Sequence, residues 1–306
     1  MAAASPPSPW TARMTLRLNA SAAIAPGAAA WRKADVETIG YVLSGVSPYT
    51  GNKRADQGAR VAFNISSAWV PGFAKASSGG VGYMNRHDVA ALGGRKPPPD
   101  SRSRIDDVLG AIANVPAADI YYGAVELNGA GVRYYGDICL ILKPEATEAD
   151  TLILDRNSFD LLNEPLRTST HPKGTWDPAA AGVEARALSG RWGGCLHHLA
   201  ACKILDGTPN APRRTTIGAI SEGVLADEDY IEVIRTSSFT ARDLVEARTT
   251  AADVAVETRI RDRLFTGPTP TLAALAWRRQ RRKAEAALKR AGVPVRVVVG
   301  SGRLKA

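Results

Sequence analysis

Residues 230–235 read Tyr230-Ile231-Glu232-Val233-Ile234-Arg235, an apolar run that contains a single carboxylate. The pattern predicts a strand over residues 229–235. Alternate side chains of a strand point to the same side, so Tyr230, Glu232 and Ile234 are predicted to share a face. A carboxylate on the inward face of a strand is costly unless it is paired or used in chemistry. Glu232 is therefore the first candidate for a functional side chain.

Around this strand the sequence predicts an irregular mixture of strands and helices. The turn sequence Asn128-Gly129-Ala130-Gly131 is a strong hairpin signal between the two strands that flank it. The segment 71–104 is rich in Gly, Pro and Ser and predicts a long irregular loop. The predicted strands are 15–18, 61–65, 120–127, 132–142, 151–154, 229–235 and 295–299, and the predicted helices are 35–43, 105–112, 193–205, 241–247, 252–264 and 271–291. This order favours an α+β fold over a doubly wound parallel sheet.

Length and composition limit the class of protein. At 306 residues the chain can form a large core, and we predict one domain over residues 14–306 that is preceded by a disordered tail, residues 1–13. Three cysteines give no disulfide framework, which favours a reducing, cytoplasmic compartment. No stretch is apolar for the eighteen or more residues that a membrane helix needs, so no membrane partner is expected.

Positive charge is concentrated at the end of the sequence. Residues 277–306 contain ten basic side chains and one acid, a net charge of +9 that equals the net charge of the whole chain. Such a block predicts a polyanionic partner, with DNA or RNA as the leading candidate. The predicted nucleic-acid contacts lie on the outward face of helix 271–291, and they are Arg278, Arg279, Arg281, Arg282 and Lys283. The other interpretation is a solvated helix face.

Two further motifs precede the Glu232 strand. Trp31-Arg32 comes just before the predicted helix 35–43, and Phe63-Asn64-Ile65-Ser66-Ser67-Ala68-Trp69 is a strand that ends in paired serines. In chain order, the arginine, the serine pair and the glutamate resemble the ADP-ribosyltransferase fold, which carries these three residue types on successive strands. The run Glu232-Val233-Ile234-Arg235-Thr236-Ser237-Ser238-Phe239 is similar to the region around the catalytic glutamate of DarT-type toxins.

The resemblance implies a mixed, mainly antiparallel sheet with flanking helices, and an NAD-dependent toxin or defence enzyme that modifies nucleic acid. Glu232 would stabilise the positive charge that builds on the ribose when the bond to nicotinamide breaks. Arg32 would bind the pyrophosphate, Ser66 or Ser67 would orient the ribose, and Tyr83 would stack on nicotinamide. Tyr230 stands where protein-modifying relatives have Gln or Glu, which argues for an acceptor other than arginine.

Other interpretations of the sequence stay open. A non-catalytic nucleic-acid-binding protein needs only the basic helix. A DNA-cleaving enzyme is suggested by Glu126, Asp137 and Lys143, although Ile141 occupies the position two before the lysine where a nuclease needs an acid. A second cluster, Cys195, His198 and Cys202, shares a helix face and has ligand types that suit zinc. It lacks a fourth ligand, so a structural role is favoured and no metal site is predicted.

Overall fold

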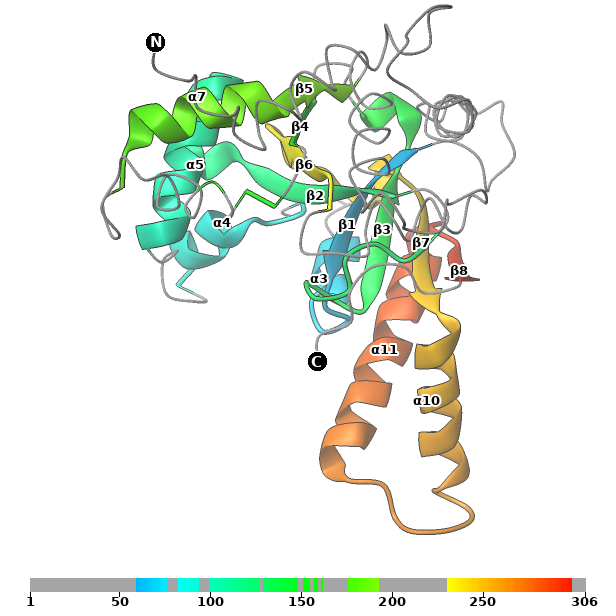
Figure 1. The fold of residues 1–306 in the computed structure, drawn as a ribbon. Coiled ribbons are helices and arrows are strands. Elements are labelled where there is room, and N and C mark those ends of the chain that lie inside the picture. Colours follow the sequence, from blue (N-terminus) through cyan, green and yellow to red (C-terminus); the bar gives the residue numbers. More distant parts are fainter. Residues whose placement is uncertain are drawn as a thin grey trace, which may run out of the picture.

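The computed structural model describes residues 59–75, 82–93, 100–126, 129–147, 151–154, 157–158, 161, 176–192 and 230–298. Its centre is an eight-stranded sheet with the strand order β5-β4-β6-β2-β1-β3-β7-β8 (Figure 1). The strands are β1 (Arg60–Ile65), β2 (Tyr121–Glu126), β3 (Ile138–Leu142), β4 (Leu152–Leu154), β5 (Ser189–Arg191), β6 (Glu232–Arg235), β7 (Leu244–Thr250) and β8 (Val295–Val298). All pairings are antiparallel except that of β7 with β8. The mixed α+β class is confirmed.

Helices cover both faces of the sheet. On one face, α3 (Val70–Lys75) and α11 (Leu272–Arg290) pack against apolar side chains of β1, β2 and β6, such as Phe63 and Val233. On the other face, α5 (Asp100–Ala113) and α7 (Pro178–Leu188) pack against Leu154 and Ile234. The alternation of Val233 and Ile234 between two cores confirms the predicted strand periodicity over β6 (Glu232–Arg235). Tyr230 and Ile231 precede the strand and both lie in the first core, so the predicted strand over 229–235 is too long.

Several helices begin with a side-chain cap. Asp177 caps α7 before Pro178, Thr250 caps α10 (Ala251–Asp262), and Thr271 caps α11, each through a side-chain oxygen that accepts an N–H of the first turn. Asn85 and Asp88 form a reciprocal capping box at α4 (Arg86–Ala91). The predicted irregular loop over 71–104 is therefore wrong where it is described, because α3, α4 and the start of α5 lie within it. In the parts of the chain that the structure describes, no helix is long and apolar enough to span a bilayer.

The predicted hairpin between β2 and β3 is wrong, because β1 lies between these two strands and pairs with both. The connection, here called the crossing loop (residues 129–137), is held across β1 by side chains of the sheet. The Glu126 carboxylate accepts the N–H groups of Gly129 and Gly131 at 2.9 and 2.6 Å. The Asn64 amide donates to the carbonyls of Ala130 and Gly136 at 3.0 and 3.1 Å. These buried polar contacts replace the tight turn that the sequence predicts.

The crossing loop lies so close to β1 that Gly136 has no room for a side chain. A Cβ at this position would overlap the backbone of Ile65 and Ser66. We expect Gly136→Ala to lower the free energy of unfolding by about 1–3 kcal/mol, as overpacking does. Gly182→Ala is the control, because nothing lies within 4 Å of the added Cβ in helix α7; there alanine should stabilise by roughly 0.5–1 kcal/mol. Urea unfolding of both variants measures the difference, and a neutral Gly136→Ala would contradict the loop's placement.

Two elements near the C-terminal end of the described chain also differ from prediction. The segment 241–247 is not a helix: a 3₁₀ turn, η4 (Ala241–Asp243), leads directly into β7. The predicted final strand forms as β8, an edge strand in which Val295 and Val298 are half-buried and Arg296 and Val297 are exposed. The predicted helices over 252–264 and 271–291 are confirmed as α10 and α11. The predicted tail 1–13 and the predicted helices over 35–43 and 193–205 lie outside the described residues.

Candidate active site around Glu232

Glu232 lies in the interior of the sheet. Strand β6 is paired on both edges, with Ala124 of β2 and Leu154 of β4 as the partners of Glu232. Its side chain is on the face that α5 covers, and it is 1% exposed. The sequence prediction that this carboxylate points inward is confirmed. A buried ionised carboxylate requires hydrogen-bond donors or a cation, and the neighbouring residues supply both.

Both carboxylate oxygens of Glu232 have a donor. The backbone N–H of Ser158 donates to Oε2 at 2.8 Å, and the Tyr230 hydroxyl lies 3.3 Å from Oε1. That hydroxyl is also 3.1 Å from the hydroxyl of Tyr135. Because a tyrosine has one hydroxyl proton and a carboxylate can only accept, Tyr230 donates to Glu232 and accepts from Tyr135. A hydrogen-bonded chain therefore links the buried carboxylate to the crossing loop.

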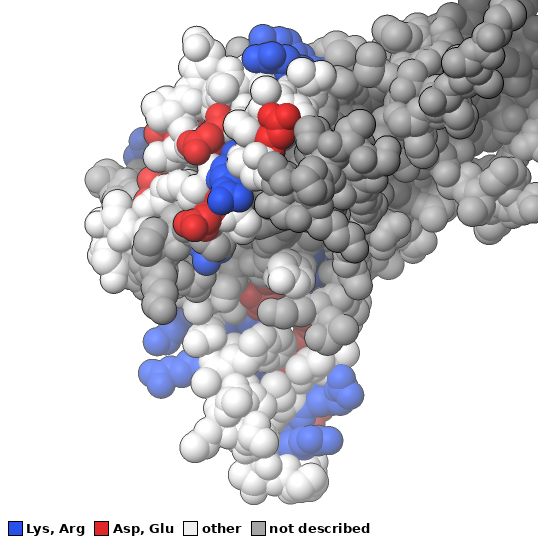
Figure 2. Space-filling model, turned by 60° about the vertical axis from the view of Figure 1, so that its left-hand side comes forward, with Lys and Arg blue, Asp and Glu red and all other residues white. Residues whose placement is uncertain are grey.

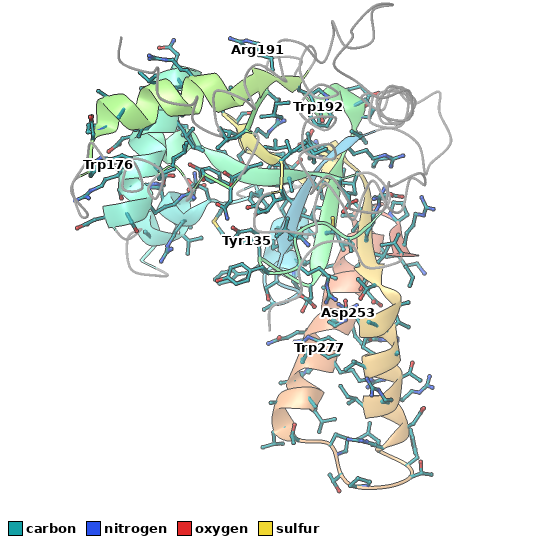
Figure 3. All side chains as sticks on the ribbon, in the orientation of Figure 1. Tyr135, Trp176, Arg191, Trp192, Asp253 and Trp277 are labelled. Carbon is teal, nitrogen blue, oxygen red and sulfur yellow. The ribbon has the colours of Figure 1, made fainter. Side chains whose placement is uncertain are left out.

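The outer end of this hydrogen-bonded series, Tyr135, is on the surface. Tyr135, labelled in Figure 3, is 49% exposed, and the neighbouring Tyr134 is also exposed. The two rings meet edge to face with their centroids 5.2 Å apart. Exposed aromatic rings offer an apolar surface against which a planar ligand ring can stack. The crossing loop thus places an aromatic surface directly outside the group that contacts Glu232.

The cation of the site is Arg102, which comes from α5. Its guanidinium donates to the Ser158 hydroxyl at 3.2 Å and pairs with Asp106 at 2.8 Å. It also lies over the Tyr122 ring, 3.5 Å from the centroid, and the Tyr122 hydroxyl donates to Asp106 at 2.6 Å. His87 Nε2 lies 2.8 Å from the second oxygen of Asp106. Arg102 is therefore held in one orientation on the same side of the sheet as Glu232.

Burial and charge act in opposite directions on Glu232. Loss of water raises the pKa of the Glu232 carboxyl above its ordinary value, while Arg102 and the donors from Ser158 and Tyr230 lower it without full compensation. Burial also raises the pKa of Tyr230 and of Tyr135, and the Glu232 charge adds to both shifts. The two tyrosines therefore stay protonated and act as donors at neutral pH. A buried carboxyl with a perturbed pKa and a defined cation partner is typical of functional sites.

The raised pKa gives a test that requires no ligand. A carboxyl whose pKa is higher in the folded state stabilises the fold fully below its unfolded pKa, and this contribution is lost as pH rises through its folded pKa. Glutamine does not titrate. We therefore expect the stability of Glu232→Gln relative to wild type to increase from pH 4 to pH 8, as measured by urea unfolding at each pH. A stability difference that does not change with pH would contradict the raised pKa.

The serine pair lies away from this carboxylate. Ser66 comes four residues after Ala62, whose β2 partner Ala124 pairs with Glu232, so the two sites are separated by roughly 13 Å along the strand. The crossing loop connects them, because the Ser67 N–H donates to Asp137 at 2.7 Å, two residues after Tyr135. The structure does not bring the serine hydroxyls to Glu232.

Tyr83 lies on the opposite face of the sheet from Glu232. Its ring stacks on Phe239 at 4.8 Å and contacts Phe63, which points to the α3 side. Burial raises the pKa of Tyr83 to about 12. The predicted nicotinamide contact is therefore corrected, because this ring packs in an aromatic cluster. Arg32 lies outside the described residues, as do Cys195, His198 and Cys202.

The predicted nucleic-acid contacts of α11 divide into two groups. Arg279, Arg282 and Lys283 are exposed, and Arg278 is half-buried. Arg281 is fully buried, so its predicted outward orientation is wrong. The reason is a set of acceptors below the helix: its guanidinium binds Asp137 at 3.0 Å, Thr249 at 2.6 Å, and Glu257. Arg281 therefore fixes α11 to the body.

The three residues of the nuclease alternative have separate partners. The Glu126 carboxylate accepts N–H groups of the crossing loop, Asp137 pairs with Arg281, and the Lys143 ammonium donates to the Arg242 carbonyl at 2.6 Å. Asp137 precedes β3 and is not in a strand. Among the described residues no three His, Cys, Asp or Glu side chains gather as metal ligands would. The described geometry gives the nuclease alternative no support.

Sequence reasoning missed Arg102, Ser158 and Tyr135 as members of the site. Tyr230 had a signal, since alternation places it beside Glu232. Arg102 belongs to a segment predicted to be loop, and its approach to Glu232 depends on tertiary packing of α5. No protein-family model matches the chain, and a search of curated proteins found no match. The site is therefore interpreted from its geometry.

Proposed function

We propose that this chain is an NAD-dependent ADP-ribosyltransferase that uses Glu232 as its catalytic carboxylate and nucleic acid, with DNA favoured, as its acceptor. One observation carries the proposal: a buried carboxylate at the start of the interior strand β6 has a donor on each oxygen, an arginine on the same side of the sheet, and a hydrogen-bonded connection to an exposed tyrosine. The order of Arg32, the serine pair and Glu232 along the chain adds the support of a sequence resemblance, although the serine hydroxyls do not contact Glu232 in this structure.

The reaction breaks the bond between nicotinamide and ribose, and positive charge builds on the ribose ring as it breaks. A carboxylate in a site of low dielectric stabilises that charge strongly. The ribose hydroxyl would take the hydrogen bond that Tyr230 now makes to Glu232, once Tyr135 and Tyr230 move aside. The exposed rings of Tyr134 and Tyr135 would stack on a planar ring of the dinucleotide. Arg102 acts as a positioning residue, because it orients Ser158 and balances the Glu232 charge.

Incubation of the purified protein with NAD labelled on the adenylate half tests the proposal. Single-stranded DNA, duplex DNA, RNA and a protein mixture would serve as acceptors, and the released nicotinamide would be quantified in parallel. Transfer of the label to DNA is the expected result. Transfer to RNA or protein would keep the enzyme class and change the acceptor, whereas intact NAD with every acceptor would refute the enzymatic proposal.

A second candidate function is nucleic-acid binding without NAD chemistry. It is favoured by the exposed basic side chains on α11, which require no catalytic group. The same incubations separate the two candidates, because a binding protein retains labelled DNA on a filter but leaves NAD intact. The two functions share a partner and differ in whether Glu232 is needed.

A further inference from the structure

A helical arm projects from the body of the protein (Figure 1). It is defined here as residues 254–283, which comprise most of α10, the connecting tip 263–271 and the first part of α11. The arm is fixed at its base by Arg281, which binds Glu257 of α10, and by Asp253, which pairs with Arg133 of the crossing loop at 2.6 Å. Its orientation is therefore set by buried ion pairs.

Basic side chains lie on both flanks of the arm, as Figure 2 shows. The exposed ones on the α10 side are Arg259, Arg261 and Arg263, and those on the α11 side are Arg279, Arg282 and Lys283. Arg261 pairs with the exposed Asp262 at 2.9 Å, while Glu257 and Asp253 face Arg281. The acids of α10 nearest the body are thus neutralised internally, and the flanks keep a strong positive charge. The α10 arginines extend the basic surface that the sequence placed on α11 alone.

The tip of the arm is apolar and exposed. Phe265 is 81% exposed and Leu272 is 86% exposed. The turn that carries Phe265 is ordered by backbone hydrogen bonds, since the N–H groups of Phe265 and Thr266 donate to the Asp262 carbonyl at 3.0 and 2.9 Å. Gly267 then reverses the chain with a positive φ of 104°. The exposed ring is therefore presented by a defined turn.

We propose that the arm binds single-stranded or locally unpaired nucleic acid, with its flanking arginines on phosphates and Phe265 stacked on an unpaired base. Alternating basic and aromatic contacts are how proteins bind single strands without a sequence code. Arginine outnumbers lysine on the flanks, and its guanidinium matches phosphate oxygens in pairs. This binding does not depend on the NAD chemistry proposed above, because the arm is separate from Glu232.

The extent of the charge favours a nucleic acid over a membrane surface. Lys283 follows Leu272 by eleven residues of α11, which is about 16 Å along the helix axis. An apolar tip that enters a bilayer interface is buried by only about 5–10 Å, so the basic groups farthest from the tip would remain outside the lipid headgroups. A flexible polyanion can follow both flanks along their length.

The test compares Phe265→Ser with a matched control, Val183→Ser, which removes another exposed apolar side chain, 67% exposed, from α7. Affinity for a fluorescent single-stranded DNA of twenty nucleotides would be measured by anisotropy without NAD, in the wild-type and Glu232→Gln backgrounds. We expect Phe265→Ser to weaken binding about 5- to 150-fold, which corresponds to the loss of one stacked base. Phe265→Trp keeps an aromatic ring at this position and should bind as the wild type does. Val183→Ser should bind as the wild type does.

A second pair of variants tests the flanks. Arg263→Ser and Arg282→Ser should each reduce the slope of log affinity against log salt by roughly 0.7 for a single strand. The proposal is overturned if Phe265→Ser binds DNA like wild type, or if the wild type sediments with vesicles of phosphatidylserine and phosphatidylcholine while it fails to bind DNA. Because no NAD is present and Glu232→Gln is included, failure of arm binding and failure of NAD turnover are separate results.

Discussion

Glu232→Gln is expected to reduce NAD turnover by at least about 100-fold, the usual loss when a group that stabilises transition-state charge is removed. Glutamine keeps the size of the side chain and can accept from the Ser158 N–H, which donates to Glu232 at 2.8 Å. It cannot supply the negative charge that opposes the developing charge on ribose. In the wild type, turnover should rise with pH through the raised pKa of Glu232, because only the ionised form is active.

The matched control is Glu126→Gln on the neighbouring strand β2. Glu126 is as buried as Glu232 and also accepts backbone N–H groups, from Gly129 and Gly131. Both variants lose a buried charge, but Glu126 contacts only backbone N–H groups of the crossing loop in these bonds, whereas Glu232 is linked through the Tyr230 hydroxyl to the exposed Tyr135 side chain. Release of nicotinamide from saturating NAD measures the effect, and circular dichroism confirms the fold. Equal loss in the two variants would indicate a structural role for Glu232.

Arg281→Met is expected to lower the free energy of unfolding by about 3–5 kcal/mol, the usual effect of breaking a buried ion pair from one side. The guanidinium is fully buried and binds Asp137, Glu257 and Thr249. Methionine fills much of the space but leaves two carboxylates without their cation. Guanidinium chloride unfolding, followed by tryptophan fluorescence, measures the change, and Trp277 lies beside Arg281 as a local reporter (Figure 3).

Arg282→Met provides the comparison at the adjacent position of α11. The Arg282 side chain is exposed, and substitutions of this kind usually change stability by no more than about 0.5 kcal/mol. Arg282→Met should instead weaken DNA binding. Arg281→Met is not a clean test of DNA binding, because that variant is also destabilised. If both variants were equally stable, the ionic cluster at the base of the arm would contribute nothing to folding.

The sequence predicted the strands whose periodicity or apolar content is strong. The β6 segment alternates between two cores as expected, and the inward position of Glu232 follows from that alternation. The helix predicted over 241–247 is wrong because the β7 segment Leu244-Val245-Glu246-Ala247-Arg248 contains good helix formers. In the fold, β3 and β8 pair with its two edges, and Glu246 pairs with Arg248 and Arg60. Pairing partners distant in sequence override local propensity.

Of the candidate site, the sequence predicted only the part that depends on the strand periodicity of β6, namely Glu232. Arg102 reaches the Glu232 side because α5 packs on β6, and no local pattern reports that contact. Arg281 is a second residue whose buried position the sequence analysis did not predict. We predicted it on the outward face with the other basic residues of α11, but its i, i+3 and i+7 spacing to Ala284 and Leu288 puts it beside the buried face, where Asp137 and Glu257 bind it. A buried arginine is identified by acids on other elements, which a single-sequence pattern does not reveal.

The strand order has a consequence for synthesis on the ribosome. Strand β2 ends at Glu126, but its partner β6 ends at Arg235, 109 residues later. At about 5–20 residues per second, the edge of β2 stays unpaired for roughly 5–20 s of translation. An unpaired edge is a template for association with other nascent chains. The edge of β2 therefore stays open to association with other nascent chains until β6, the strand that carries Glu232, has been synthesised and pairs with it.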